Sequence, residues 1–250
     1  MAVELALQNP ARDESVADRW VYVLTAALFA AVAIVGFAPR SMAILAGELR
    51  FPPLIVHVHA ALMVAWLGLL LAQTLLVAKD RTALHMKLGL ASLVVAPCLW
   101  ATMIAITIWR YDERAELGQI VQGSNILLTQ ARSIIYFALF FTWAFLVRKT
   151  DRETHKRMML LATVGLMGAA ITRMTWLPTT FPEGYGAVHA YMLLLLAPSL
   201  TYDIVRLGRP HRAYVIGLAL FLPWLLLTQL LWGSPWWVET ASKLMGVDAG

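Results

Sequence analysis

Histidines and a glutamine lie within a long apolar stretch of this chain, where polar side chains are costly to bury. The stretch FPPLIVHVHAALMVAWLGLLLAQTLLV, residues 51–77, carries His57, His59 and Gln73. Residues separated by seven or fourteen positions share a helix face, so His59 lies with Trp66 and Gln73, whereas His57 points roughly 160° away. This spacing predicts that His59 faces the bundle interior and that His57 meets outer loops or lipid headgroups. The alternative for His59 is a helix-start histidine bonded to a loop carbonyl.

A second polar stripe surrounds an arginine in a later apolar stretch. The stripe repeats at helical spacing through Asn125, Thr129, Arg132 and Tyr136. Arg132 is expected about 10 Å inside its span, where an arginine usually faces the bundle interior or a cavity. The alternative is that its side chain snorkels to the outer surface. With Arg173 and His189, which fall in the same half of their spans, these residues predict an outer polar site.

Three further histidines open apolar segments directly after basic loops. They are His85, His155 and His211, and Asp203 is expected at the same side of the bundle. Imidazole is tolerated at the membrane interface, so these histidines have a simple explanation as neighbours of lipid phosphates. The other interpretation is an inner site that they share.

Paired histidines and interior arginines suit the chemistry of haem b. Two histidines on facing helices supply axial ligands, and arginines neutralise the propionates. We therefore expect an outer site of His59 and His189 with Arg132 and Arg173, and an inner site of His85 and His155. If Arg132 has an anionic partner, it is a bound anionic group or Glu183, the main acid of the nearby loop.

Zinc is the main alternative cofactor. Three histidines can hold Zn²⁺ and leave one position for a water, as in hydrolases, and His85, His155 and His211 form such a set. A copper site, a proton or quinone pathway, and a non-catalytic accessory subunit of a membrane complex are further possibilities. The chain has no CxxCH, HExxH, P-loop or glycine-rich dinucleotide motif.

The composition places these side chains in a membrane protein. The 250 residues are 60% hydrophobic and 14% charged, well outside the range of soluble domains. The net charge of +5 is explained by cationic cytoplasmic loops, so no nucleic-acid partner is expected. The single cysteine, Cys98, excludes an intramolecular disulfide and a cysteine metal site.

Seven stretches are long and apolar enough to cross a bilayer as helices. They are 21–39, 55–78, 88–109, 125–147, 158–176, 187–206 and 213–232. The sequence therefore predicts an all-α, seven-helix transmembrane domain over residues 21–232. A cytoplasmic segment over 1–20 precedes it, and a short segment over 233–250 follows it.

The distribution of lysine and arginine predicts the orientation. Thirteen of the twenty lie on the side of the N-terminus and of the second, fourth and sixth loops, against seven on the other side. Cytoplasmic loops carry the excess of such residues, so we expect the N-terminus inside and the C-terminus outside. We therefore expect a multi-pass protein of the bacterial inner membrane. Its expected partners are lipid and a quinone, a redox protein or a larger membrane complex.

Four stretches carry a resemblance to a known family. They are 57-HVHAALMVAWLGLLLAQ-73, 85-HMKLG-89, 155-HKRMMLLATVGLMGAAITR-173 and 202-YDIVRLGRPH-211. Through them the chain resembles a family of uncharacterised bacterial multi-pass membrane proteins. More distantly, its paired histidines resemble those of the ascorbate-reducing transmembrane b-type cytochromes, which implies haem and electron transfer. The expected layout is also similar to that of zinc hydrolases of the adiponectin-receptor and ceramidase type.

Overall fold

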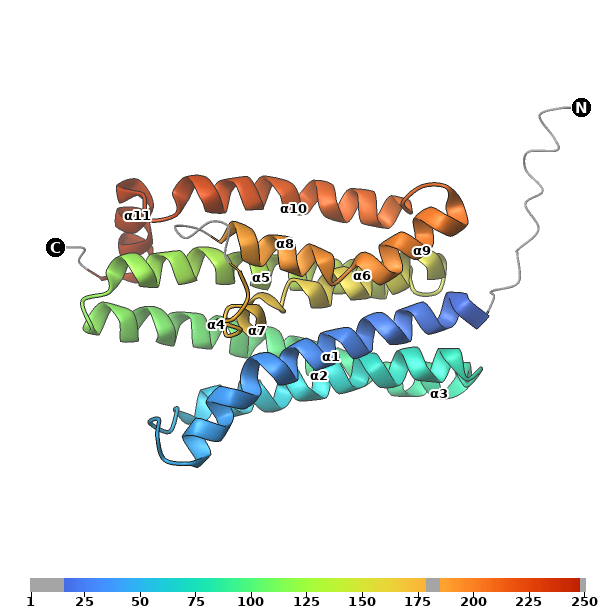
Figure 1. The fold of residues 1–250 in the computed structure, drawn as a ribbon, viewed down its shortest axis with the longest axis horizontal. Coiled ribbons are helices and arrows are strands. Elements are labelled where there is room, and N and C mark those ends of the chain that lie inside the picture. The colour runs from blue at the N-terminus through green and yellow to red at the C-terminus, as the bar shows by residue number, and fades with distance from the viewer. Residues whose placement is uncertain (1–15, 179–184, 248–250) are drawn as a thin grey trace, which may run out of the picture.

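The apolar stretches form long helices that lie side by side (Figure 1). The computed structural model describes residues 16–178 and 185–247, and within these ranges every regular element is a helix. The bounds in chain order are α1 Val16–Leu45, α2 Leu54–Ala78, α3 Thr82–Gly89, α4 Ser92–Glu116, α5 Ile120–Val147, α6 Arg152–Val164, α7 Gly168–Ile171, α8 Gly186–Leu194, α9 Ala197–Leu207, α10 Arg212–Leu231 and α11 Pro235–Met245. The predicted all-α class is confirmed.

Five helices are long and apolar enough to cross a membrane, which is fewer than the seven stretches of the sequence. They are α1, α2, α4, α5 and α10, and the bent pair α8 and α9 makes a sixth if it counts as one span. These helices are compatible with a multi-pass membrane protein. The two predicted spans that have no single long helix are 158–176 and 187–206, because the helix is broken in each.

The predicted span 187–206 bends by 53° between α8 and α9. The reason is Pro198, which lacks a backbone N–H, and whose ring clashes with the carbonyl of the fourth residue before it. That residue is Leu194, where α8 ends. Pro198 then stands in the first turn of α9, where its missing donor costs nothing.

The predicted span 158–176 breaks after Val164, the last residue of α6. The N–H groups of Leu166 and Met167 bond carbonyls three residues back, at 3.0 and 3.1 Å, instead of four. Glycine at 165 and 168 weakens the regular helix on both sides of this turn. The break thus exposes a backbone carbonyl, that of Gly165, to side chains of other helices.

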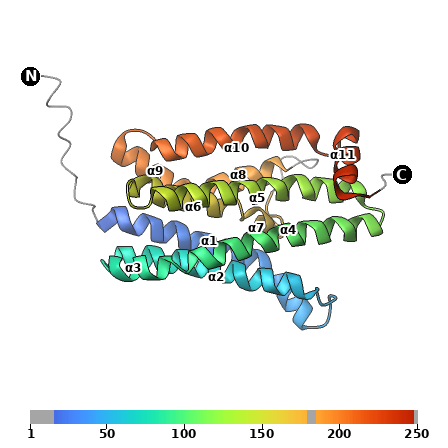
Figure 2. The same cartoon turned by 180° about the vertical axis from the view of Figure 1, so that it is seen from behind.

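Helix α5 occupies the centre of the bundle. It packs against α4 and α6 over most of its length and contacts α10 and α11 as well (Figure 2). Its buried face carries the whole predicted stripe of Asn125, Thr129, Arg132 and Tyr136. On the other side of the molecule, Gly36 lets α1 approach the backbone of Ala170 in α7, because a Cβ at this glycine would collide with it.

Helical structure also lies outside the predicted spans. Helix α3 occupies the expected loop after residue 79, α4 continues through Glu116, and α11 lies in the expected C-terminal segment. Figure 1 shows α11 across the end of the bundle opposite the start of α1. The Trp237 indole donates to the carbonyl of Ser124 at 2.8 Å, which anchors α11 to α5.

Asp151 caps α6 at the end of the bundle where α1 begins. Its carboxylate accepts hydrogen bonds from the Thr154 N–H at 2.9 Å and the Thr154 hydroxyl at 2.7 Å, and it also pairs with Arg212. Burial opposes ionisation of Asp151, but these hydrogen bonds outweigh it and lower the pKa to about 2. Because the folded pKa lies below the ordinary value of 3.8, the carboxylate stabilises the fold above that pH.

We expect Asp151→Ala to lower the free energy of unfolding by about 1 kcal/mol at pH 7, the usual cost of losing an N-cap. The difference from wild type should shrink as the pH falls through 3.8 toward 2, because the native carboxylate then becomes protonated. Thermal unfolding in detergent across this pH range measures it. Asp112→Ala, on the exposed surface of α4, is the matched control and should change little. An undiminished difference at pH 2 would contradict the assignment.

Candidate functional site

The inner histidines His85 and His155 share one hydrogen-bonding arrangement. The His85 Nδ1 lies 3.3 Å from the carbonyl oxygen of Gln73 in α2, and the His155 Nδ1 lies 2.9 Å from that of Ala144 in α5. A carbonyl only accepts, so the bond at His155 requires the proton on Nδ1. The proton-free Nε2 then remains on the His155 ring, which is the form in which histidine ligates a metal.

The two inner rings also influence each other. His85 and His155 lie close enough for their charges to interact, and Arg148 adds to the positive field at His155. Burial lowers the pKa of His85 below its ordinary value of 6.5, so its ring is neutral at pH 7. The structure therefore brings together the two histidines that the sequence assigned to an inner pair, each with its ring held by a neighbouring helix.

Helix α3 is held in place by the side chain of Gln73. With its amide nitrogen toward the His85 carbonyl and its oxygen toward the Gly89 N–H, this side chain makes bonds of 3.0 and 2.9 Å, and the same nitrogen donates to the His85 Nδ1. The glutamine that the sequence placed on the interior face thus fixes the short helix that carries His85.

The third histidine of the zinc interpretation lies apart from the inner pair. His211 is the N-cap of α10, and its Nδ1 accepts from the Ala213 N–H at 3.2 Å. Its charged neighbours are acids and Arg157, none of them a histidine. Among residues 16–178 and 185–247, no group of three or more histidine, cysteine or acidic side chains is placed to hold a metal ion. The structure thus does not assemble His85, His155 and His211 as a three-histidine site.

The outer histidines are also separated. His59 is half-buried, and its Nδ1 lies 3.1 Å from the Thr102 hydroxyl of α4. His57 stacks on Phe51 of the preceding segment, with ring centroids 4.6 Å apart. His189 packs instead against Tyr185 and Phe221, so it shares none of these neighbours with His59. The geometry does not support the expected outer haem site.

Arg132 lies deeper than the sequence indicated. It is 1% exposed and stands twelve residues into α5, about 18 Å from the helix start, so it does not snorkel. Its Nη2 donates to the Ser133 hydroxyl at 3.1 Å and the Gly165 carbonyl at 3.4 Å. The guanidinium carbon lies 5.6 and 5.5 Å from the ring centroids of Tyr185 and Phe221. Its Nε and Nη1 have no hydrogen-bond partner among the described residues.

Arg173 and Arg132 both interact electrostatically with Tyr185, but their other contacts differ. Its guanidinium lies over the ring of Phe37 in α1, 4.5 Å from the centroid, and donates to the Ala169 carbonyl on its own helix. The expected pairing of the two arginines around one anionic group is therefore not seen. Glu183, the acid expected near Arg132, lies outside the described residues.

A buried ion pair at the inner end escaped the sequence analysis. Arg157 of α6 donates through both Nε, at 2.7 Å, and Nη2 to the carboxylate of Asp203 in α9, and both residues are at most 3% exposed. Tyr22 and Tyr214 place their rings 5.8 and 6.0 Å from the guanidinium carbon. The signal in the sequence was an acid inside one predicted span and an arginine directly before another, at the same end of the bundle, where a buried charge needs a partner.

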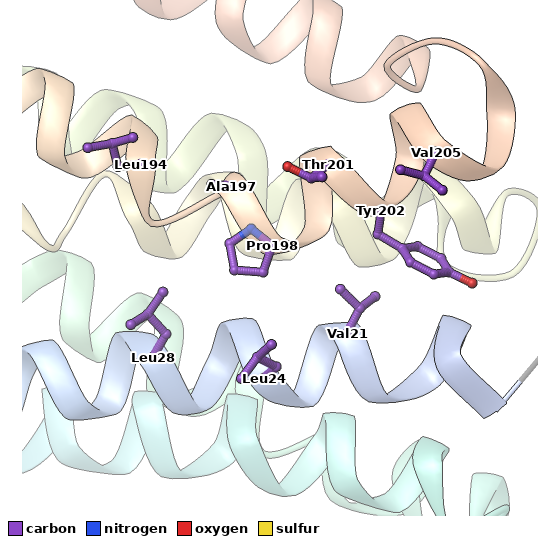
Figure 3. Close-up of a pocket in the computed structure, with 9 residues that line it drawn as sticks. All are labelled: Val21, Leu24, Leu28, Leu194, Ala197, Pro198, Thr201, Tyr202 and Val205. Atoms are coloured by element: carbon purple, nitrogen blue, oxygen red, sulfur yellow. The ribbon is translucent and has the colours of Figure 1, made fainter.

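An apolar groove on the outside of the bundle follows from the bend between α8 and α9. It has a volume of about 580 Å³ and lies between α1 and the bent pair (Figure 3). Its lining is Val21, Leu24, Leu28, Leu194, Ala197, Pro198, Thr201, Tyr202 and Val205. The Tyr202 hydroxyl donates to Asp18 at 2.6 Å, which links α9 to α1 at the groove's end. The groove has the character of a lipid-facing surface, and the chemistry-bearing side chains lie elsewhere.

No protein-family model matches this chain, and neither a curated protein nor a solved structure shows significant similarity to it.

The Arg157–Asp203 pair should dominate the stability of the inner end. Removing one partner leaves a buried charge, so Arg157→Leu and Asp203→Leu should each cost about 3–5 kcal/mol of unfolding free energy. The double variant should cost much less than the sum, since neither charge remains. Thermal unfolding of the three variants in detergent measures this coupling. Additive losses would show that the two side chains do not act as a pair.

Proposed function

We propose that this protein is a redox-linked membrane protein that binds haem b between His85 and His155. The observation that carries the proposal is the matched orientation of the two rings: each Nδ1 is bonded to a backbone carbonyl of another helix. In histidines that ligate metals, a backbone carbonyl beside the other ring nitrogen commonly holds the ring in its orientation. The residues present thus fit a two-histidine ligand set.

Bound haem b would supply one-electron chemistry at the inner end of the bundle. The chain's own part is to hold both imidazoles neutral and to fix the orientation of each ring. Arg148, next to His155, supplies positive charge of the kind that a propionate requires. Its guanidinium carbon lies 3.5 Å from the Phe145 ring centroid, which fixes its position at the end of α5.

The site would exchange electrons with a partner at the membrane. A quinone in the bilayer, a redox protein or the other subunits of a larger membrane complex are the partners that suit a site near the bundle end. The proposal places the protein in a bacterial inner membrane.

Absorption spectroscopy of the full chain tests the haem proposal. Protein produced with haem precursor supply and purified in detergent should show a Soret band with about one haem per chain. His85→Ala and His155→Ala should each remove most of the bound haem, because one axial ligand is lost. His57→Ala is the matched control, since that ring stacks on Phe51, and it should retain the band.

Three outcomes would count against this proposal. Colourless wild-type protein that contains no iron would refute haem binding. Stoichiometric zinc in the same preparation, lost on changing His85 or His155, would favour the metal-dependent hydrolase. Loss of the band in His59→Ala and His189→Ala, but not in the inner variants, would show that the haem binds in the outer half.

We also propose seven crossings with the N-terminus inside and the C-terminus outside. The broken segment α6–α7 and the bent pair α8–α9 would then each count as one crossing. The proposal is supported by the lysine and arginine distribution and by the positions of α1 and α11 at opposite ends of the bundle (Figure 1). In this orientation the haem site faces the cytoplasm.

Reporter fusions test the topology. Alkaline phosphatase fused after Gly250 should be active, because that enzyme matures only outside the cytoplasm. A fluorescent protein that folds only in the cytoplasm should fail at the same point and succeed in the loop after Ala78. An inactive phosphatase together with a bright fluorescent fusion at Gly250 would overturn the orientation.

A further inference from the structure

The deepest charge of the described bundle is not neutralised by the residues around it. Arg132 stands near the middle of α5, and a charged side chain at the centre of a bilayer costs about 3 kcal/mol on insertion scales. Among residues 16–178 and 185–247, no carboxylate pairs with it, in contrast to Arg157 with Asp203. This absence separates Arg132 from the other fully buried arginine.

The unpartnered donors of Arg132 are numerous. A guanidinium carries five N–H groups, one on Nε and two on each Nη. Because Nε and Nη1 lack partners, three of these donors are buried without a hydrogen bond. The Nε2 of His189, a side chain that is 1% exposed, is a second buried polar atom without a partner.

The helix break and a glycine bring further polar atoms to this place. Gly165 turns its carbonyl toward Arg132 and Ser133 instead of into a helical ladder. A Cβ on Gly168 would lie 2.5 Å from the Tyr185 hydroxyl and 3.4 Å from Arg132 Nη2, so both groups pack against this glycine. The break after α6 thus contributes a carbonyl beside Arg132, and the start of α8 contributes the Tyr185 hydroxyl and the His189 imidazole.

We propose that Arg132 and the Tyr185 hydroxyl form a binding site, with the His189 ring as one wall, for one small monovalent anion, either a halide or the carboxylate of a short organic acid. One guanidinium charge balances one negative charge, whereas a divalent anion would leave net charge in hydrocarbon. Hydrogen bonds to ionised groups are about twice as strong as neutral ones, which suits the free Nε and Nη1 donors.

The size limit follows from the aromatic walls. The rings of Tyr185 and Phe221 lie within 5.6 Å of the guanidinium carbon, and the Tyr185 and His189 ring centroids are 5.0 Å apart. Aromatic rings packed this close to the guanidinium favour a small anion over a ring system such as a quinone head or a porphyrin. The site is therefore independent of the proposed haem pair at the inner end.

Equilibrium dialysis of the purified full chain tests the proposal. Protein in detergent is exchanged into sodium gluconate, whose anion is too large for the site, and titrated with radioactive chloride or radioactive formate at constant ionic strength. We expect saturable binding of about one anion per chain for at least one of them. Chloride alone would assign a halide site, and formate alone a carboxylate site.

Variants locate the bound anion. Arg132→Gln should weaken binding by about 10- to 100-fold, the usual effect of losing hydrogen bonds from a charged group. Arg132→Lys keeps the charge and should retain part of the affinity. Arg212→Gln, which removes a largely exposed guanidinium that pairs with Asp151, is the control and should bind as wild type does.

Gly168→Ala keeps the test decisive if Arg132→Gln fails to fold. The added methyl enters the space between the Tyr185 hydroxyl and Arg132, so it should reduce anion affinity while every charge remains. The same anion should raise the unfolding temperature of wild type but not of Gly168→Ala. Wild-type protein that binds neither chloride nor formate saturably, or binds them equally well after Gly168→Ala, would overturn the proposal.

Discussion

The interior of this bundle has to satisfy its charged groups without water, and most of its features follow from that constraint. A bilayer core offers no hydrogen-bond partners, so side chains and backbone must supply them. Arg157 and Asp203 meet the requirement with each other at the inner end, and they hold α6 to α9 in doing so. Arg132 meets it only in part, through a hydroxyl, a freed carbonyl and two aromatic rings.

The irregular helices are where this constraint is resolved. Ending α6 at Val164 gives Ser133 and Arg132 a carbonyl to bond, which a continuous helix would have kept for itself. Ending α8 at Leu194 leaves His189 and Met192 on the buried side of a short helix. Backbone irregularity inside a membrane is tolerated only where protein or a cavity covers it, and both breaks lie against α5 or its neighbours.

Hydropathy and helical spacing predicted the membrane-helix class, the buried stripe on α5 and the different surroundings of His57 and His59. These features depend on residues of a single helix, whose geometry is fixed. Spacing could not reveal which helices are neighbours. It therefore placed His59 and His189 in one site although their neighbours differ, and it missed the pair of Arg157 and Asp203. The bend at Pro198 could be predicted from the proline alone. The break at Gly165 could not, because its freed carbonyl is bonded by side chains of α5. Helix α11 was missed because it is short and amphipathic.

The central claim is that His85 and His155 jointly ligate a haem. Electron paramagnetic resonance of the oxidised, haem-supplied protein tests this directly, because the signal reports the axial ligands. Two imidazoles predict a low-spin ferric signal in the wild type, replaced by a high-spin signal or by none in His155→Ala. A high-spin signal in the wild type, or a low-spin signal unchanged in both His85→Ala and His155→Ala, would contradict the account.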